Sequence, residues 1–338
     1  MTTANSRNWV QRLGSANWPT RVIRDRRTVQ TLATLSVLTL MCFVFAMLSD
    51  RFVTISNLQN VMRNTAPMAI AGCGMTAIMI ARGLDLSIGS VLAASSVLAA
   101  KLAVLGVPLP AALALALVFG AGVGMVNGLV IAGLSVSPII VTLGMLNIAR
   151  GIAYLITPSA ILVGLPPNWS YLGTAKIGVL PMPILIAIVV IAAFHWLTVY
   201  SVFGKRIYAT GGNEEAARLS GINVRRTLVV LYVLCAMTAA LAGLVLSSRV
   251  GAGDPNIGIG FELQVIAAVI IGGTSLSGGE GRILGTVLGA FIIGVLSNGL
   301  NLAGVEPFWQ YVAQGLVLIA AVVVDRRVNQ GVLRFGGR

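Results

Sequence analysis

Charged side chains are scarce in this sequence. Only 10% of its 338 residues are Asp, Glu, Lys or Arg, whereas a typical soluble domain has about a quarter of its residues charged. No segment is both long and polar enough to form a separate soluble domain. The composition therefore excludes an ordinary soluble fold.

Histidine and cysteine are also scarce, which argues against metal sites and most catalytic sites. The one histidine, His195, has no metal ligand or catalytic partner nearby in the sequence, and we interpret it as an interfacial side chain beside Trp196. Cys42, Cys73 and Cys235 lie in apolar runs without metal-site spacing and are expected to be small buried hydrophobic residues. We therefore predict no catalytic residue, no metal site and no enzymatic activity.

Long apolar runs are abundant instead. Hydrophobic residues make up 57% of the chain, and runs near the ~20 residues needed to cross a bilayer recur along its length. The runs are continuous rather than alternating, which favours helices over barrel strands. We predict an all-α polytopic membrane protein of about ten transmembrane helices. The predicted spans cover residues 31–49, 66–81, 89–105, 111–133, 138–157, 181–200, 227–248, 263–273, 283–304 and 308–324.

Three of these spans have features of their own. Pro67 is expected to open the second span. Gly120, Gly124 and Gly128 form two Gly-x-x-x-Gly patterns, which allow a neighbouring helix to approach closely. The apolar run 263–273 is too short to cross at ~1.5 Å per residue. It predicts a broken or re-entrant helix, unless it merges with the glycine-rich residues 272–282 into one crossing.

The basic residues are concentrated in three segments. Residues 1–30, 201–226 and 325–338 hold 15 of the 23 Lys and Arg residues and only four acids. This is the positive-inside pattern, so all three segments are predicted to be cytoplasmic, with both termini on that side of the membrane. Residues 31–324 would form the membrane domain. Nucleic acid is not expected as a partner, because no basic fold accompanies the charges.

The longest polar interruption, Ser201–Arg226, is predicted to contain a short helix. Asn213 can cap a helix by accepting a backbone N–H bond, and Glu214 and Glu215 would then lie in the first turn, where negative charge suits the helix dipole. Gly221 is a natural residue to end it. We predict a helix over Glu214–Ser220 that docks on a soluble partner and transmits force from it. An ordinary solvated loop helix is the alternative.

A few polar side chains lie in or between the spans and are candidates for a transport pathway. Asp85 is the most deeply placed acid, and an ionisable group at that depth suggests function; alternatively it caps the next span or pairs with Arg82. Neutral amides can bind solute hydroxyls or join helices to each other. The candidates are Asp85, Asn127, Gln264, Asn298, Asn301 and Gln310.

A weak internal repeat is also present. The segment Asn127–Pro138 resembles Asn298–Pro307, and the two would run in opposite directions, as in an inverted repeat. Gly83-x-x-Leu-Ser87 also resembles Gly273-x-x-Leu-Ser277, but this second pair does not fit the same inversion. Chance similarity in a sequence rich in Gly, Ala and Leu is the alternative.

Several motifs together resemble a known family. The run GGNEEAARLSGI (211–222) is similar to the coupling loop of ABC importer permeases, with its EAA-x-x-x-G pattern kept from Glu215 to Gly221. GLDLSIGS (83–90), GGTSLSGGEGRILGT (272–286) and NGLNLAGV (298–305) resemble the ribose-type sugar permeases in particular. The resemblance extends from about the second span to the C-terminus.

The resemblance implies partners and residue roles. It implies an inner-membrane subunit, usually present in two copies, that works with a cytoplasmic ABC ATPase and a periplasmic sugar-binding protein. ATP would bind the ATPase, and this chain would need no cofactor. The external loops 158–180 and 249–262 would receive the binding protein. The residues that would form the coupling helix are Glu214, Glu215, Ala216, Ala217, Arg218 and Gly221.

Three other functions remain as alternatives. A branched-chain amino-acid permease is the nearest, while a secondary carrier would need ion ligands inside the membrane, which are scarce here. An intramembrane enzyme would need a nucleophile and base, which we do not find. Leu276-Ser-Gly-Gly-Glu280 looks like an ABC ATPase signature, but no phosphate-binding loop accompanies it.

Overall fold

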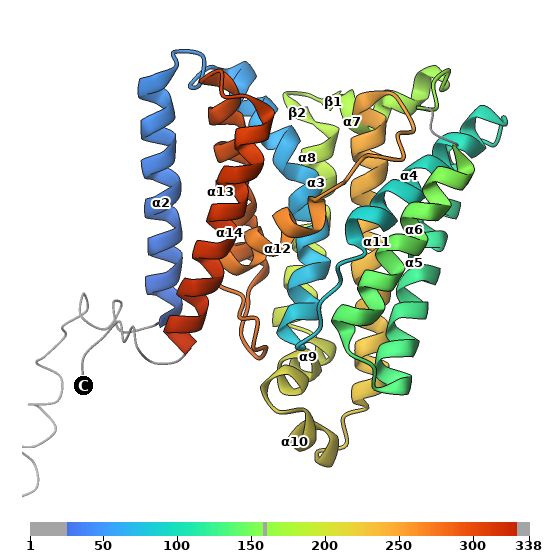
Figure 1. Ribbon diagram of the computed structural model, residues 1–338, viewed down its shortest axis with the longest axis vertical. Coiled ribbons are helices and arrows are strands. Elements are labelled where there is room, and N and C mark those ends of the chain that lie inside the picture. The colour runs from blue at the N-terminus through green and yellow to red at the C-terminus, as the bar shows by residue number, and fades with distance from the viewer. Residues whose placement is uncertain (1–25, 158–160, 330–338) are drawn as a thin grey trace, which may run out of the picture.

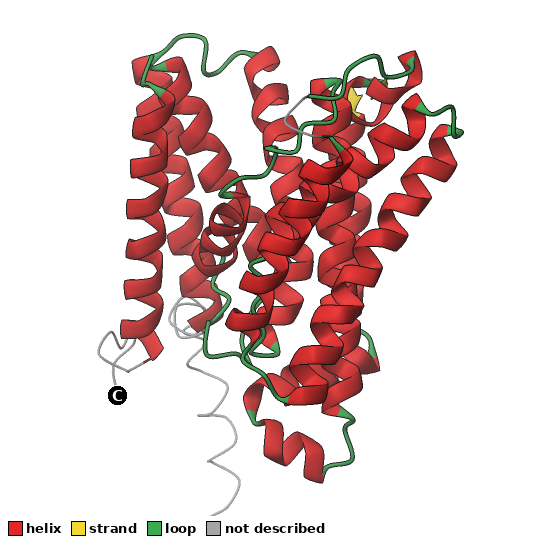
Figure 2. Cartoon of the chain, turned by 45° about the vertical axis from the view of Figure 1, so that its right-hand side comes forward, coloured by secondary structure: helices red, strands yellow, loops and turns green. Residues whose placement is uncertain are grey.

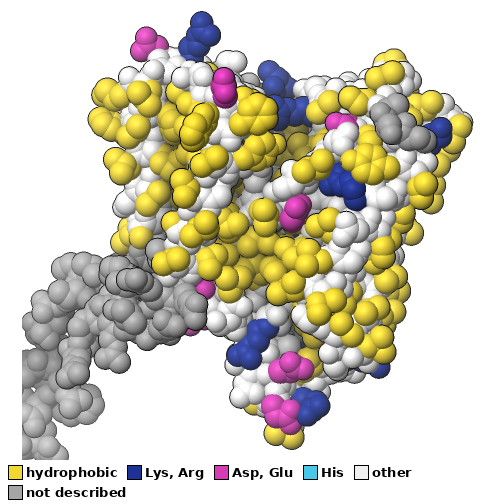
Figure 3. Space-filling model, in the orientation of Figure 1, with side chains coloured by type: hydrophobic (Ala, Val, Ile, Leu, Met, Phe, Trp, Pro, Cys, Tyr) yellow, Lys and Arg dark blue, Asp and Glu magenta, His cyan; other side chains and the backbone are white. Residues whose placement is uncertain are grey.

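The computed structural model describes residues 26–157 and 161–329, and these residues form a bundle of helices (Figures 1 and 2). Residues 1–25 and 330–338, which make up most of the two predicted basic ends, lie outside the described residues. On the face shown in Figure 3, most charged side chains gather toward the two ends of the bundle and apolar side chains cover much of the middle. This distribution suits a protein that crosses a bilayer.

Six of the described helices are long and apolar enough to span a membrane. They are α2 (Arg26–Leu48), α5 (Leu109–Leu134), α6 (Pro138–Ile156), α8 (Met182–Val199), α11 (Val224–Val250) and α13 (Ile283–Leu302). Three more have shorter apolar stretches: α4 (Ile88–Val104), α12 (Phe261–Ile271) and α14 (Pro307–Asn329). These helices confirm an all-α polytopic membrane protein, while the number of ten crossings stays a prediction.

The helix α3 (Ile55–Ile80) corrects the expected start of the second span. We expected Pro67 to open this helix, but α3 begins twelve residues earlier, where Thr54 accepts a hydrogen bond from the backbone of Asn57, and Pro67 lies inside it. A proline removes only one backbone bond from a helix. From Thr65 onward α3 is buried, packed against α8, α11 and α13. Tertiary packing therefore keeps the helix continuous through the proline.

The predicted glycine contact joins α5 to α11. A Cβ atom added at Gly124 would lie 2.7 Å from the Cα of Val233, and one at Gly128 would lie 2.7 Å from the Cα of Val229. At Gly120 the same atom would lie 2.8 Å from the Cβ of Ala240. The backbones of α5 and α11 thus meet along one glycine face, as the Gly-x-x-x-Gly patterns predict.

Two helices, α4 and α12, begin in the interior of the bundle. An irregular segment leads from the end of α3 back to α4, and another leads from α11 to α12, which lies midway along the bundle in Figure 1. The two meet near their N-termini, because a Cβ atom added at Gly89 would overlap Gly258 and Glu262. The structure thus confirms the broken helix at 263–273, and residues 272–282 form a separate connection before α13 rather than merging with it.

The order of elements bears on the predicted repeat. A long helix, an irregular segment, a short helix and a long helix follow one another in α3–α4–α5 and again in α11–α12–α13. Asn127 lies on α5 and Asn298 on α13, so this pair stands at matching places. Gly83–Ser87 precedes its short helix, whereas 273–277 follows α12. The second pair therefore does not stand at matching places, as its failure to fit the inversion already indicated, and the inverted repeat itself stays a prediction.

An ordered connection lies at the end of the bundle opposite the short helix α10 (Glu214–Leu219). It contains η1 (Pro167–Ser170), α7 (Tyr171–Thr174) and the two-residue strands β1 (Lys176–Ile177) and β2 (Leu180–Pro181), which pair antiparallel with Lys176 opposite Pro181. The buried Trp169 holds this connection against α11. Its indole N–H donates to the carbonyl of Ser247 at 3.3 Å, and its own carbonyl accepts from the hydroxyl of Ser248 at 2.6 Å. We call this the hairpin end of the molecule.

Candidate functional site

The short helix α10 (Glu214–Leu219) forms where the sequence predicts it. The side chain of Asn213 accepts a hydrogen bond from the backbone N–H of Ala216 at 3.0 Å, and Glu214 and Glu215 occupy the first turn. Gly221 takes the left-handed conformation (φ 81°) just after the helix. The cap and the glycine therefore define both ends, and the helix is one residue shorter than predicted.

The side chains of α10 are mostly exposed. Ala217 is buried, whereas Leu219 is 80% exposed. Arg218 donates to the carboxylate of Glu215 at 2.6 Å, and this bond raises the pKa of the Arg218 guanidinium. Surface ion pairs of this kind contribute little to stability. An exposed leucine and an acidic first turn at the tip of the molecule are thus free to contact another protein.

The helix α9 (Val202–Gly212) connects α10 to the bundle. The hydroxyl of Ser201 accepts from the backbone of Gly204 and begins α9, and Ile207 is fully buried. Tyr208 donates its hydroxyl to the carbonyl of Gly281 at 2.9 Å. Figure 1 shows α9 beside the ends of the long helices and α10 beyond them. We call this side of the molecule the α10 end; α9 joins α10 to the bundle on one side, and residues 220–223 join it to α11 on the other.

Asp85 lies in a buried polar cluster with Ser87 and Asn127. One carboxylate oxygen of Asp85 accepts from the backbone N–H of Ser87 at 2.9 Å and from its hydroxyl at 2.5 Å, and Asn127 donates to the same hydroxyl at 3.2 Å. All three side chains are fully buried. The carboxylate therefore orders the backbone that leads into α4.

The expected pairing of Asp85 with Arg82 does not occur. Arg82 instead donates to the carbonyls of Ser277 and Gly212, at the surface of the α10 end. The physical reason is geometric: Arg82 has a left-handed backbone (φ 65°), and its side chain leaves the interior while Asp85 stays in it. The alternative, in which Asp85 caps the following helix, is met only in part: its carboxylate accepts from Ser87, the residue just before α4, and no side-chain cap bond is formed among the described residues at the start of that helix.

Two oxygens of this cluster have no donor among the described residues. They are Oδ2 of Asp85 and Oδ1 of Asn127, both buried. A buried acceptor left without a donor costs roughly 1–3 kcal/mol. One proton on Asp85 would supply the missing donor.

This leads to a prediction for Asp85→Asn. The new amide would donate where the carboxylate cannot, while its oxygen would still accept from Ser87, so the variant should keep wild-type thermal stability and transport. Asp85→Ala should lower stability by roughly 1–3 kcal/mol, because the two donors of Ser87 lose their acceptor. Thermal unfolding in detergent and solute uptake measure the two effects. If Asp85→Asn is as damaging as Asp85→Ala, the negative charge itself is required and the proton account is wrong.

The other amide candidates mainly join helices. Asn298 on α13 exchanges two hydrogen bonds with Asn57 on α3, at 2.9 and 3.0 Å, inside the bundle. Gln264 on α12 donates to Gln314 on α14 at 2.9 Å. Inside a membrane such bonds contribute about 0.6 kcal/mol each to helix association. Sequence reasoning missed Asn57, because it lies in a stretch that was expected to be outside the membrane.

Two candidates remain on the side of α13 and α14. Gln310 donates to the carbonyl of Val305 and accepts from Ser297, both at 3.3 Å, and is half-buried. Asn301 is exposed on α13. The structure therefore divides the six candidates into the Asp85–Asn127 cluster and a second group on α12, α13 and α14.

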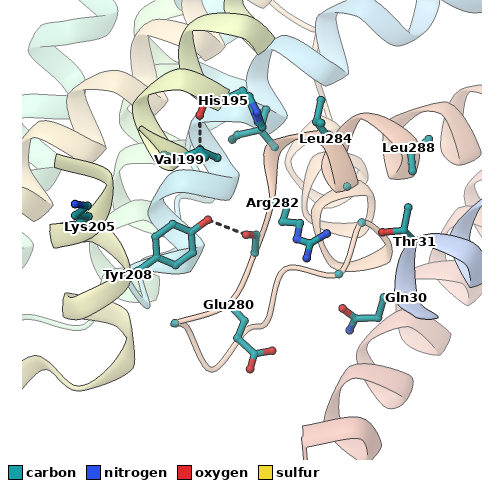
Figure 4. A pocket seen from close by; sticks show the side chains of 17 residues that line it. Gln30, Thr31, His195, Val199, Lys205, Tyr208, Glu280, Arg282, Leu284 and Leu288 are labelled. Atoms are coloured by element: carbon teal, nitrogen blue, oxygen red, sulfur yellow. Dashed lines mark hydrogen bonds between the residues drawn. The ribbon is translucent and has the colours of Figure 1, made fainter. Parts of the chain in front are cut away.

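A cavity of about 880 Å³ opens near the α10 end, and the described residues lining it come from α2, α8, α9, the connection before α13 and the start of α13 itself. Figure 4 shows Arg282 and His195 around it, with the Tyr208 hydroxyl bonded to the Gly281 carbonyl at its edge. None of the six pathway candidates is among these lining residues. The half-buried His195 packs edge-on against Tyr200, with ring centres 6.1 Å apart, which fits the expected interfacial role.

Comparison with known proteins agrees with this architecture. A family described as "Branched-chain amino acid transport system / permease component" matches residues 57–322. The ribose import permease protein RbsC of Escherichia coli K12 is 41% identical over 288 residues, which are 84% of this chain and 90% of that protein. RbsC of Bacillus subtilis 168 is 39% identical over 88% of this chain and 94% of its own length.

A third relative has a different sugar in its name. The L-arabinose transport system permease protein AraH of Escherichia coli K12 is 38% identical over 87% of this chain and 89% of its own length. No solved structure matches the chain. The match to the family and the coverage of these relatives agree along most of the sequence, and the chain therefore belongs to this family of transport-system permease components.

Proposed function

We propose that this chain is the membrane-spanning subunit of an ATP-driven ABC importer for a monosaccharide. The observation that carries the proposal is α10, a capped and exposed helix at the tip of the molecule with the EAA-x-x-x-G pattern. The relatives named above are permeases for ribose and arabinose, which supports a sugar rather than a branched-chain amino acid.

The proposed partners follow from the two ends of the molecule. The α10 end would face the cytoplasm, where Glu214, Glu215, Ala216, Ala217, Arg218 and Gly221 would form the element that a two-copy ATPase holds. The hairpin end would face the periplasm and receive a sugar-binding protein. A second permease copy and surrounding lipid would complete the assembly, and ATP would bind only the ATPase. Nucleic acid has no part in it.

We propose that the buried polar candidates and the partly exposed ones have different roles. Asp85, Asn127 and Asn298 would hold helices together, since their side chains are buried and bonded to each other or to neighbouring helices. Gln264, Asn301 and Gln310 are at least partly exposed on α12, α13 and α14, although Gln264 and Gln310 are also bonded to a neighbouring helix. These three would be the side chains that meet the solute hydroxyls, with access switching between the two sides as the ATPase closes.

A secondary carrier is the rival from another class. It would bind a driving ion with charged groups inside the bundle, and the described part of the chain has no group of three His, Cys, Asp or Glu residues that could hold a metal ion. Asp85 is the buried acid nearest to such a role, and it is already bonded to Ser87.

The energy source tests the proposal. Cells that contain the chain and its transport partners should keep taking up radiolabelled monosaccharide when an uncoupler collapses the proton gradient while ATP is maintained. Depleting ATP with the gradient intact should stop uptake. Uptake that stops when the proton gradient collapses and continues when ATP is depleted would support a secondary carrier. A panel of ribose, arabinose, allose, xylose and leucine in the same assay distinguishes the solute classes, and uptake of leucine alone would contradict the sugar proposal.

A further inference from the structure

Three segments that are distant in the sequence touch at the α10 end. They are the end of α3 around Ile80, the junction of α9 and α10 at Gly211–Gly212, and the tight turn 275–280. The backbone N–H of Gly279 donates to the carbonyl of Ile80 at 2.8 Å. A Cβ atom added at Gly211 would overlap that same carbonyl, and one added at Gly279 would lie 3.2 Å from the Cα of Gly212. The three backbones are therefore in direct contact.

Arg82 is the side chain that connects these segments. Its Nε donates to the carbonyl of Ser277 at 2.8 Å, and its Nη2 donates to the carbonyl of Gly212 at 3.1 Å. The planar guanidinium holds both acceptors at fixed angles, which a lysine ammonium cannot do. One side chain thus joins the connection after α12 to the last residue of α9.

Each of the three connected segments leads to a different helix. Gly212 directly precedes Asn213, which caps α10. Residues 83–87 lead from Arg82 through the Asp85–Ser87 bonds into α4. The turn 275–280 lies between α12 and α13, and it is closed by a bond from the N–H of Ser275 to the carbonyl of Glu280. Beside the direct backbone contacts, the side chain of Arg82 thus connects α10 with the segments leading to both short helices.

We propose that Arg82 is a positioning residue that transmits the displacement of α10 to α4 and α12 together. The proposal rests on the proposed function, since it assumes that a partner moves α10. It adds a specific link between that partner and the short helices α4 and α12. Without the Arg82 side chain, Gly212 and the turn 275–280 keep only their backbone contacts, and the coupling of α10 to the two short helices is weakened.

Arg82→Gly is the appropriate variant for the test. The left-handed backbone of Arg82 is one that glycine adopts without strain, so this change removes the side chain and leaves the turn intact. Arg82→Lys keeps the charge but cannot hold both carbonyls. Arg206→Gln is the matched control, because it removes one exposed positive charge from α9, a neighbouring element at the same end, and no hydrogen bond of its side chain is seen among the described residues.

The measurement is made on the full complex of permease, ATPase and binding protein in proteoliposomes. It records solute transported, ATP hydrolysed and thermal stability for each variant. Arg82→Gly should assemble and hydrolyse ATP, while the solute moved per ATP falls about tenfold, corresponding to the loss of one charge-assisted bond pair. The solute moved per ATP by Arg82→Lys should lie between the values for the wild type and for Arg82→Gly. Arg206→Gln should behave as wild type.

Two results would overturn the inference alone. A wild-type transport ratio in Arg82→Gly would show that the connection carries no motion. Failure of Arg82→Gly to assemble, with a lowered unfolding temperature and an unchanged ratio in the surviving complexes, would show that Arg82 is only structural. A wild-type complex that hydrolyses ATP without moving any monosaccharide would contradict the proposed function, and this inference with it.

Discussion

Glu215→Lys should reduce solute transport by about tenfold or more, the effect of losing one important contact of a protein interface. Glu215 lies in the first turn of α10, and its side chain is 63% exposed. Reversing its charge changes what a partner meets at this surface. Membrane insertion should be unaffected, since α10 lies outside the bundle. Transport and co-purification of the ATPase measure the effect.

A second variant separates docking from helix stability. Glu215→Lys combined with Arg218→Glu restores the ion pair within α10 but keeps the reversed charges on its surface. If α10 docks on a partner, this swap should transport as poorly as the single variant. If α10 is only a solvated loop helix, both variants should transport at the wild-type rate.

Gly124→Ala should lower the unfolding temperature by several degrees, because over-packing a close contact costs roughly 1–3 kcal/mol. The added methyl group would meet the backbone of Tyr232 and Val233 on α11, and no flexible side chain is available there to move aside. The helices α5 and α11 would have to separate. Thermal unfolding in detergent, followed by circular dichroism, measures the shift.

Gly122→Ala provides the matched control for this prediction. Gly122 lies on the same helix, two residues away, and a Cβ atom added there meets nothing within 4 Å. Alanine favours helix over glycine by about 1 kcal/mol, so this variant should be neutral or slightly stabilising. Equal effects of the two substitutions would show that the glycine contact with α11 does not determine stability.

Local signals in the sequence predicted the local structure well. Apart from the start of α3, the positions of the long helices followed from continuous apolar runs, and α10 followed from Asn213 and Gly221, because a cap and a left-handed glycine act within one or two turns. The close approach of α5 was predicted from Gly120, Gly124 and Gly128. Its partner was not, since glycine spacing indicates a contact without identifying the opposite helix.

The parts that depend on tertiary contacts could not be predicted in this way. Arg82 and Asp85 are three residues apart, so pairing between them was a reasonable local expectation. The fold instead brings Arg82 to Gly212 and Ser277, which are 130 and 195 residues away in the sequence. Pro67 indicated a helix start, but packing of α3 against its neighbours outweighed that local preference. The pairing of Asn57 with Asn298 likewise depends on two helices from opposite ends of the chain.

The central claim is that this chain moves solute only when a separate ATPase drives it through α10. The most direct test compares proteoliposomes that contain the chain alone with proteoliposomes that contain it with the ATPase, with binding protein and ribose outside and ATP inside. The account predicts accumulation of ribose against its gradient only in the second preparation. Accumulation by the chain alone, driven by an ion gradient and without ATP, would contradict it.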